Sequence, residues 1–271
     1  RSTPKPSSAA SDVYKRQIYN IAAQSHVRIS FDIPQYTVQA NALGIVNILE
    51  AWRNNCPTAR FYQASSSEMF GRSVDEDGYQ RETTKMNPTS PYGCTKVFGF
   101  NMTQHYRHAY KLFACNGILF NHESERRGIE FVTRKISEGV AKIKLDLADS
   151  IALGNLDARR DWGYAPDYVE GMWLMMQQDE PDDFVLATGV SHSIREFLDI
   201  AFDEIGIDNW ENFVTQDPQF FRPAEVDVLR GDATKAKEIL GWEPKTRFNE
   251  LVRKMVRSDL ALIQRKLGGR L

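Results

Sequence analysis

The chain has few of the residues that build metal sites or disulfide frameworks. Its 271 residues include three cysteines, Cys56, Cys94 and Cys115, and five histidines. None of the cysteines has the spacing of a metal site, and an odd number of them without a secretory signal favours a reducing cytoplasm. We therefore expect no metal, no disulfide framework and a cytoplasmic location.

Long apolar runs and clusters of basic residues are also lacking. No run approaches the roughly 20 apolar residues that a membrane-spanning helix needs. The formal net charge is −2, with 34 basic and 36 acidic residues intermixed along the chain, which argues against a nucleic-acid-binding surface. We expect neither a membrane nor a nucleic acid as a partner. The length suits one large domain, or one domain with a smaller lobe.

A glycine-rich phosphate-binding turn is the third absence. Neither G-x-G-x-x-G nor G-x-x-G-x-x-G occurs among the 17 glycines, although such a turn normally opens a dinucleotide-binding domain. Residues 1–17 are rich in Ser, Pro, Lys and Ala, and residues 11–17, SDVYKRQ, look like translated adapter sequence. We expect 1–17 to be a non-native or disordered tail and exclude it from fold reasoning.

The remaining sequence alternates between strand and helix patterns. Strands are predicted at 59–64, 113–119, 151–153 and 184–188, and helices at 34–55, 92–110, 131–147, 166–178, 194–204, 235–240 and 247–265. This alternation is typical of an α/β protein with a parallel sheet. Gly268 and Gly269 indicate a loose end over 263–271.

The most informative segment is 90–96, SPYGCTK, which places Tyr92 and Lys96 four residues apart on one face of a predicted helix. Ser90 is a plausible N-cap, and Pro91 suits the first helical position. A neighbouring ammonium favours a phenolate, so Tyr92 is a candidate base. Alone, however, the pair also fits a chance arrangement on the surface.

A second segment carries hydroxyl and acidic side chains. The predicted strand at 59–64 runs into residues 65–68, SSSE, which include Ser66 and Glu68. Ligands bind at the carboxyl ends of strands in α/β proteins. The alternative is a polar loop whose serines cap the next turn.

Together these segments resemble the extended short-chain dehydrogenase/reductases, and later strings narrow the resemblance to the GDP-mannose 4,6-dehydratases. The strings are AAQSHV at 22–27, GILFNHES at 117–124, FVTRK at 131–135, LGNLD at 153–157, RDWG at 160–163 and FRPAEV at 221–226. The resemblance covers about residues 18–262. It implies an incomplete Rossmann-like, doubly wound parallel sheet over 18–120, with a smaller GDP-sugar-binding domain mainly over 121–262.

The resemblance also implies a reaction and the residues that carry it. A dehydratase of this kind oxidises C4 of GDP-mannose, eliminates water across C5 and C6, and returns the hydride to C6. Tyr92 would take the C4 hydroxyl proton with Lys96 lowering its pKa, Ser66 would bond that hydroxyl, and Glu68 would serve the elimination. The implied cofactor is NADP, and a homo-oligomer, either a dimer or a tetramer, is implied as well. The implied cofactor contacts are Ile21, Ala22, Ala23, Gln24, Ser25, Tyr36, Lys96, His122 and Arg127. The implied substrate contacts are Asn121, Val132, Lys135, Gly154, Asn155, Arg160, Arg222 and Glu225.

The chain departs from the family pattern at several positions. Ser66 replaces the more usual threonine, and Glu125 stands where the family has proline. The basic residues of 126–127 and 134–135 suit anionic ligands or a second subunit, or else form a solvated face. The family pattern before its fourth strand, which includes the glycine-rich turn, has no counterpart in this sequence. We therefore expect this chain to be an inactive fragment. Another sugar-nucleotide epimerase or reductase, or a non-catalytic sugar-nucleotide-binding protein, remain alternatives.

Overall fold

A four-stranded parallel sheet organises one half of the molecule. In this computed structural model the described residues are 16–221, 223, 224, 226 and 228–268. The strand order is β1-β2-β3-β7, formed by β1 (Gln17–Asn20), β2 (Arg60–Ser66), β3 (Ala114–Leu119) and β7 (Asp183–Leu186). All six residues of β3 are buried, as expected for a parallel strand covered on both faces. The prediction of an α/β protein with a parallel sheet is confirmed.

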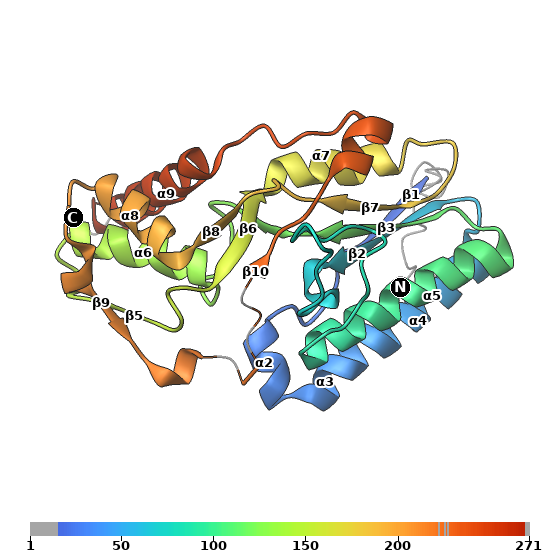
Figure 1. Ribbon diagram of the computed structural model, residues 1–271, viewed down its shortest axis with the longest axis horizontal. Helices are drawn as coiled ribbons and strands as arrows, with labels where there is room; N and C mark the ends of the chain where they lie inside the picture. Colours follow the sequence, from blue (N-terminus) through green and yellow to red (C-terminus); the bar gives the residue numbers. More distant parts are fainter. Residues whose placement is uncertain (1–15, 222, 225, 227, 269–271) are drawn as a thin grey trace, which may run out of the picture.

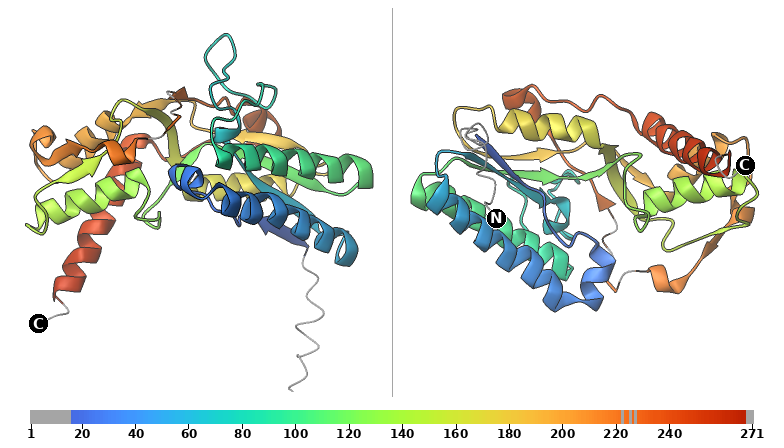
Figure 2. Two further views of the ribbon diagram at one scale, coloured as in Figure 1. Left: turned by 90° about the horizontal axis from the view of Figure 1, so that it is seen from below. Right: turned by 180° about the vertical axis from the view of Figure 1, so that it is seen from behind.

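Helices cover both faces of this sheet. The helices α4 (Gly44–Asn55) and α5 (Pro91–Tyr110) lie along one face, and α7 (Ala165–Met175) lies along the other (Figure 1 and Figure 2). Ahead of α4 come α2 (Val27–Asp32), α3 (Pro34–Val38) and the π-helical turn η1 (Gln39–Leu43). The predicted helix at 34–55 is confirmed, with one π turn inside it. Trp52 anchors its end by donating from Nε1 to the Ala59 carbonyl at 2.9 Å.

The other half is a smaller lobe with a helical core. Its helices are α6 (Val132–Lys144), α8 (Ile194–Asp203) and α9 (Phe248–Gly268), which bury one shared apolar cluster together with Trp162 and Trp210. Short strands edge this lobe: β4 (Asn121–Glu123), β6 (Arg159–Tyr164), β8 (Ser191–Ser193) and β10 (Val228–Leu229) form one sheet, and β5 (Ile151–Leu153) pairs with β9 (Val214–Gln216). Short helical turns complete the fold: η2 (Ser67–Met69), η3 (Trp210–Phe213), η4 (Pro218–Phe220) and η5 (Ala236–Leu240).

Two polar contacts join the segments between the two halves. Gln80 pairs with Gly231 in an isolated parallel bridge, and Arg81 forms ion pairs with Asp75, Asp77 and Asp232. The loop at 71–90 is therefore tied to the segment that follows β10.

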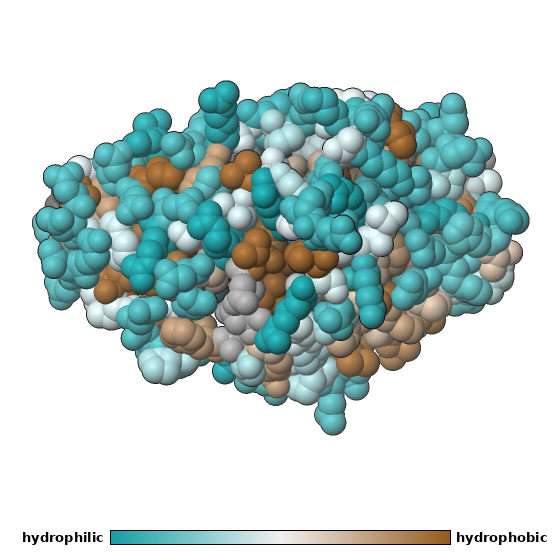
Figure 3. Space-filling model, viewed as in Figure 1, coloured by the Kyte–Doolittle hydropathy of each residue, from teal (hydrophilic) through white to brown (hydrophobic). Residues whose placement is uncertain are grey.

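The face seen in Figure 3 is mostly hydrophilic and has a small apolar area near its centre.

The predicted strands and helices are found within a few residues of their expected places. The predictions missed β1, β4, β6, β8, β9, β10 and α2, because most elements this short leave too little periodic pattern. β1 begins at Gln17, inside the segment predicted as a tail, whereas residues 1–15 lie outside the described residues. The predicted domain boundary near residue 120 stays a prediction.

Candidate active site

The carboxyl ends of β1, β2 and β3 meet at one edge of the sheet. Asn20 is the register partner of Gln63, and Ser66 is the partner of Leu119. The loop after β1, the turn after β2 and the start of β4 consequently emerge side by side. This is the edge at which open α/β sheets bind ligands.

At the end of β2 the chain turns sharply into η2. The Ser66 side chain caps this turn by accepting a hydrogen bond from the Glu68 N–H at 3.3 Å. The Glu68 side chain is buried, with 7% of the residue exposed. Ser65 instead points into the sheet and donates to Asn116 at 3.1 Å. Ser65 therefore has a structural role, whereas Ser66 lies at the edge of the sheet where ligands are expected.

The first turn of α5 brings the tyrosine and lysine to the same place. Ser90 caps the helix by accepting from the Gly93 N–H at 3.0 Å, which confirms the predicted cap. The Lys96 ammonium lies 5.6 Å from the centroid of the Tyr92 ring. Both residues are buried, with 8% of Tyr92 and 7% of Lys96 exposed. This burial excludes the alternative that Tyr92 and Lys96 form a chance pair on the surface.

Burial dominates the electrostatics of the pair. It raises the pKa of Tyr92 to about 12, against a hydrogen bond with Ser66 and the charge of Arg127, which both lower it. The Lys96 ammonium donates to the Ala64 carbonyl at 2.7 Å, and burial lowers its pKa to about 8. Among the described residues, Ser66 and Arg127 lower the pKa of Tyr92, and the expectation that Lys96 lowers it as well stays a prediction.

His122 and Arg127 approach the same edge from the smaller lobe. The Nδ1 atom of His122 lies 2.9 Å from the Phe120 carbonyl oxygen. The Arg127 guanidinium stacks 3.7 Å above the Phe131 ring, and its Nε lies 3.1 Å from the buried carboxylate of Glu123. The charge of Arg127 acts on the pKa of both Tyr92 and His122. These two predicted cofactor contacts thus lie beside the candidate catalytic groups.

The loop over 21–25 is clamped in place by Asn41. Asn41 accepts from the Gln24 N–H at 2.7 Å, donates to the Gln24 carbonyl at 3.0 Å and donates to Thr95 at 3.0 Å. Ile21 and Tyr36 are exposed, at 68% and 58%. The held backbone of this loop, the exposed side chains of Ile21 and Tyr36 and the cations of Lys96 and Arg127 are groups that suit a dinucleotide.

Some of the predicted substrate contacts gather around η4. The Lys135 ammonium lies 3.3 Å from the centroid of the Phe220 ring, and a Cβ on Gly154 would lie 2.8 Å from the Phe220 carbonyl oxygen. Val132 is the first residue of α6 and is partly exposed. Asn155 uses its side chain to accept from the Asp157 N–H, and Asn121 opens β4.

The predicted arginine contacts have different outcomes. Arg160 is buried and donates from Nη1 to the carbonyls of Arg159 and Val226, so its substrate contact stays a prediction. Arg222 and Glu225 lie outside the described residues.

Arg134 requires a correction, because it does not belong to an anion-binding or solvated basic face. It forms a buried ion pair with Asp259 at 2.7 Å, and its Nη1 donates to the carbonyls of Glu125 and Arg127. Arg134 thereby shapes the loop in which Glu125 replaces the family's proline. Sequence reasoning could not find this role, since the partner lies on α9, far along the chain.

Several supporting residues were also missed. Glu123 accepts from Thr133 at 2.7 Å, and the Phe131 ring lies 5.3 Å from that of His26. Tyr168 stacks on His122 with ring centroids 5.1 Å apart. No spacing rule brings these residues together, because each contact joins different elements.

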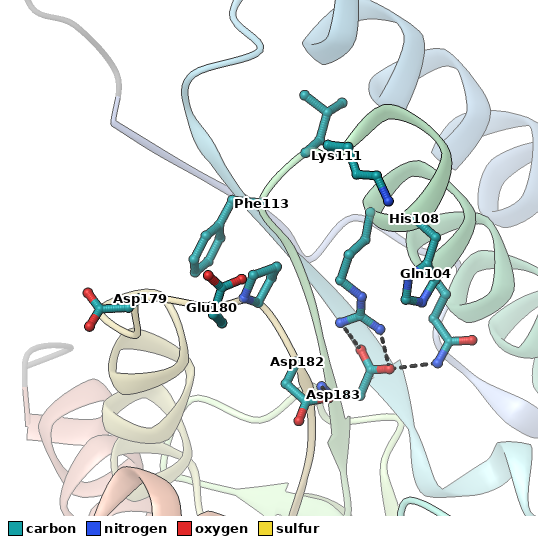
Figure 4. Close-up of a pocket in the computed structure, with 11 residues that line it drawn as sticks. Gln104, His108, Lys111, Phe113, Asp179, Glu180, Asp182 and Asp183 are labelled. Atoms are coloured by element: carbon teal, nitrogen blue, oxygen red, sulfur yellow. Dashed lines mark hydrogen bonds and ion pairs between the residues drawn. The ribbon is translucent and has the colours of Figure 1, made fainter.

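A cavity of about 660 Å³ lies at the opposite edge of the sheet (Figure 4). On one wall Asp183 accepts from Arg107 and Gln104, as the dashed lines show. Phe113 and Glu180 lie across the opening. This cavity starts where β3 and β7 begin, so it shares nothing with the candidate catalytic groups.

The described residues contain neither a cluster of metal ligands nor a membrane-spanning helix. No group of three or more His, Cys, Asp and Glu side chains in this part of the chain could hold a metal ion. Within the same residues, no helix has the length and apolar character to cross a membrane.

Comparisons with known proteins show the family. A family model described as GDP-mannose 4,6 dehydratase matches residues 8–255. GDP-mannose 4,6 dehydratase 2 of Arabidopsis thaliana is 53% identical over 92% of this chain and 67% of its own length. GDP-mannose 4,6 dehydratase of Homo sapiens is 50% identical over 93% of this chain and 72% of its own length.

Solved structures show the fold. RMD from Pseudomonas aeruginosa, complexed with NADPH, has a TM-score of 0.83 at 21% identity. The match covers 92% of this chain and 83% of the RMD chain. The dTDP-glucose 4,6-dehydratase of Bacillus anthracis, in complex with NAD, has a TM-score of 0.75 at 21% identity, with coverages of 90% and 72%. At such identities the likeness establishes a Rossmann-like α/β fold and nothing further.

Proposed function

Because the chain belongs to the GDP-mannose 4,6 dehydratase family, we propose that its site residues serve the dehydration of GDP-mannose to GDP-4-keto-6-deoxy-mannose, a hydro-lyase reaction that uses NADP. The expectation that this chain by itself is inactive stays a prediction. The observation that carries the proposal is the meeting of Ser66, Glu68 and Tyr92 at one strand edge. Few other sugar-nucleotide reactions need a buried carboxylate beside the tyrosine, because epimerases and reductases perform no elimination.

Each group has a distinct task in this proposal. Tyr92 accepts the proton of the C4 hydroxyl while Ser66, which is hydrogen-bonded to Tyr92, orients that hydroxyl. Glu68 removes the C5 proton, which the C4 ketone has made acidic, and delivers a proton to the C6 hydroxyl, which leaves as water. When the hydride is returned to C6, C5 needs a proton, and Tyr92 would supply the one that it took from the C4 hydroxyl. Tyr92 and Glu68 then both end in their starting forms, and the net change is the loss of one water molecule.

The residues present fit NADP, as the clamped 21–25 loop and the cations of Lys96 and Arg127 indicate. When bound, NADP supplies the hydride acceptor for C4 and the hydride donor for C6. Lys96 and Arg127 contribute positive charge next to Tyr92, and the burial of the site excludes water from the proton transfers. An oligomeric assembly and a cytoplasmic location stay predictions.

The test follows GDP-mannose, added together with NADP, by mass spectrometry in deuterated water. We expect loss of one water molecule and uptake of deuterium at C5, and Glu68→Gln should abolish both while GDP-mannose binding, measured by calorimetry, remains. Glu76→Gln is the matched control, since Glu76 is an exposed loop glutamate. Unchanged product from Glu68→Gln, or a C4 epimer as the product, would refute the assignment. Binding without turnover by the unmodified chain would refute catalysis by this chain and leave only substrate recognition.

A further inference from the structure

Arg127 is held at three points by residues of the smaller lobe. Its guanidinium stacks 3.7 Å above the centroid of the Phe131 ring, and its Nε lies 3.1 Å from the carboxylate of Glu123, whose side chain is only 2% exposed. Its backbone carbonyl accepts from Nη1 of Arg134 at 3.1 Å. The Arg127 side chain is still 25% exposed, so these contacts leave part of it open to a ligand.

The three contacts converge on the start of α6. Phe131 is the N-cap residue of this helix. Thr133, in the first turn, donates to the Glu123 carboxylate at 2.7 Å and so fixes the acid that faces Arg127. We call Glu123 and residues 131–134 the Arg127 seat. Each of these contacts is made by the chain itself, so the seat does not depend on a bound ligand.

Arg134 contributes to the seat through the shape of its guanidinium. Nη1 donates to the carbonyls of Glu125 and Arg127, and Nη2 lies 2.7 Å from the carboxylate of Asp259. Nε is buried and has no hydrogen-bond partner among the described residues, although an unpaired buried donor is costly. The guanidinium is therefore placed to reach these three acceptors at once, which the single nitrogen of a lysine does less well.

Asp259 connects this arrangement to the last helix. It is 1% exposed, and its two carboxylate oxygens are used by Arg134 and by Ser137, which donates at 2.6 Å. Because α6 and α9 share one apolar core, Asp259 is fixed relative to α6 by packing as well as by polar contacts. The loop at 125–127 is thereby anchored to α9.

Stability alone does not explain a buried ion pair at this point. Apolar residues of similar volume often replace such a pair without loss of stability, because taking two charges out of water is expensive. Apolar residues cannot supply the donors that reach the two carbonyls of the 125–127 loop. The contribution of Arg134 is thus geometric, and it falls on Arg127, whose charge acts on Tyr92.

We propose that Arg134, anchored by Asp259, is a positioning residue that keeps the guanidinium of Arg127 in its seat beside Tyr92. The proposal rests on the proposed function, in which Tyr92 accepts the proton of the C4 hydroxyl and Arg127 serves the cofactor. Because a side chain that is already in place loses less freedom when a ligand binds, the seat should also strengthen the binding of an anionic ligand. Arg134 and Asp259 touch neither substrate nor cofactor, since they act through Arg127.

The seat is tested first on the full chain without added ligand. ¹H–¹⁵N NMR detects the Nε–H groups of arginines, and the signal that is lost in Arg127→Lys belongs to Arg127. A proton above the face of an aromatic ring is shielded, so we expect this signal upfield of the ordinary arginine position, and Phe131→Leu should return it there. A signal at the ordinary position in the unmodified chain would overturn the proposal.

A double substitution removes the ion pair and leaves no unpaired buried charge behind. Arg134→Met combined with Asp259→Leu should unfold at about the same urea concentration as the unmodified chain. The Arg127 signal should nevertheless move to the position that it has in Phe131→Leu. A folded double variant with an unchanged Arg127 signal would overturn the positioning role.

Two further variants separate positioning from packing. Arg134→Lys keeps a cation for Asp259 but loses the fork, so the Arg127 signal should shift in the same direction, and an unchanged signal would overturn the proposal even if the double variant did not fold. Glu204→Gln is the matched control, because Glu204 forms ion pairs with two arginines of α9. It should lower the stability without moving the Arg127 signal. An equal shift in this control would show a general loosening of α9 and would also overturn the proposal.

Calorimetric titration with NADP tests the consequence for binding. We expect the double variant to bind NADP about fivefold more weakly than the unmodified chain, the effect of ordering one long side chain, and Glu204→Gln to bind with unchanged affinity. Equal affinities of the double variant and the unmodified chain would overturn the role of the seat in binding. Failure of the unmodified chain to bind NADP would refute the proposed cofactor, whereas the NMR shifts would still decide whether Arg134 positions Arg127.

Discussion

Replacing Lys96 by methionine should stabilise the fold while it abolishes turnover. Burial lowers the pKa of Lys96 from 10.5 to about 8. A depression of this size means that the folded state disfavours the ammonium by about 3 kcal/mol. Methionine has a similar length and no charge, so it removes this penalty.

Part of that gain is offset by a lost hydrogen bond. The Lys96 ammonium donates to the Ala64 carbonyl at 2.7 Å, and a charged bond of this kind contributes about 1.5–3 kcal/mol. The carbonyl keeps a second donor, the Gln63 side chain at 3.3 Å. We therefore expect Lys96→Met to be about 1 kcal/mol more stable than the unmodified chain at neutral pH.

The pH dependence gives the sharper test. Because the pKa of Lys96 is lower in the folded state, the unfolded chain binds more protons between about pH 8 and pH 10.5, and the stability of the unmodified chain rises across this window. The methionine variant lacks this titration. Between pH 7 and about pH 9.5 the free energy of unfolding of the unmodified chain should therefore rise by about 2 kcal/mol relative to that of the variant.

Urea denaturation at several pH values measures this difference. Lys237→Met is the control, because the Lys237 side chain is 67% exposed. The difference in free energy of unfolding between this variant and the unmodified chain should stay nearly constant with pH. A Lys96→Met variant that is clearly less stable at pH 7, with a gap that does not change with pH, would show that Lys96 is not penalised by burial.

Two further predictions concern stability. Asp183→Asn should lower the free energy of unfolding by about 3–5 kcal/mol in urea denaturation, because it leaves the buried guanidinium of Arg107 without its partner carboxylate. The exposed Asp179→Asn should change it little, and a similar small effect for both variants would contradict the reasoning. Gly117→Ala should cost about 1–3 kcal/mol or more by overpacking, because its Cβ would lie 2.3 Å from the Tyr62 hydroxyl. The loss measured by thermal unfolding should be smaller in a Tyr62→Phe background, and an equal loss there would exclude this clash as the cause.

Much of the fold and of the candidate site was predictable because the signals are local. The apolar periodicity of 34–55, the cap at Ser90 and the four-residue spacing of Tyr92 and Lys96 depend only on neighbours in the chain, and the structure has the corresponding helices there. The hydroxyl and acidic side chains at 65–68 follow a strand directly, so their place at a strand end could be predicted as well. The family strings added the expected reaction.

The short strands could not be predicted, and neither could the supports of the site. β4 and β6 are held by partners rather than by their own sequence pattern, and the stack of Tyr168 on His122 requires Gly163 to lie opposite that histidine. Arg134 appeared in the sequence as part of a basic segment, and only its contact with Asp259 on α9 makes it structural.

The sequence by itself determined which chemical groups the protein has and the elements on which they stand, because hydrogen bonding and apolar spacing along the chain are local properties. The tertiary structure decided their electrostatic environment. Burial raises the pKa of Tyr92 and lowers that of Lys96, an effect that their spacing along the chain does not contain. The physical reason is that the desolvation of a charge depends on every element packed around it, and those elements come together only when the chain folds.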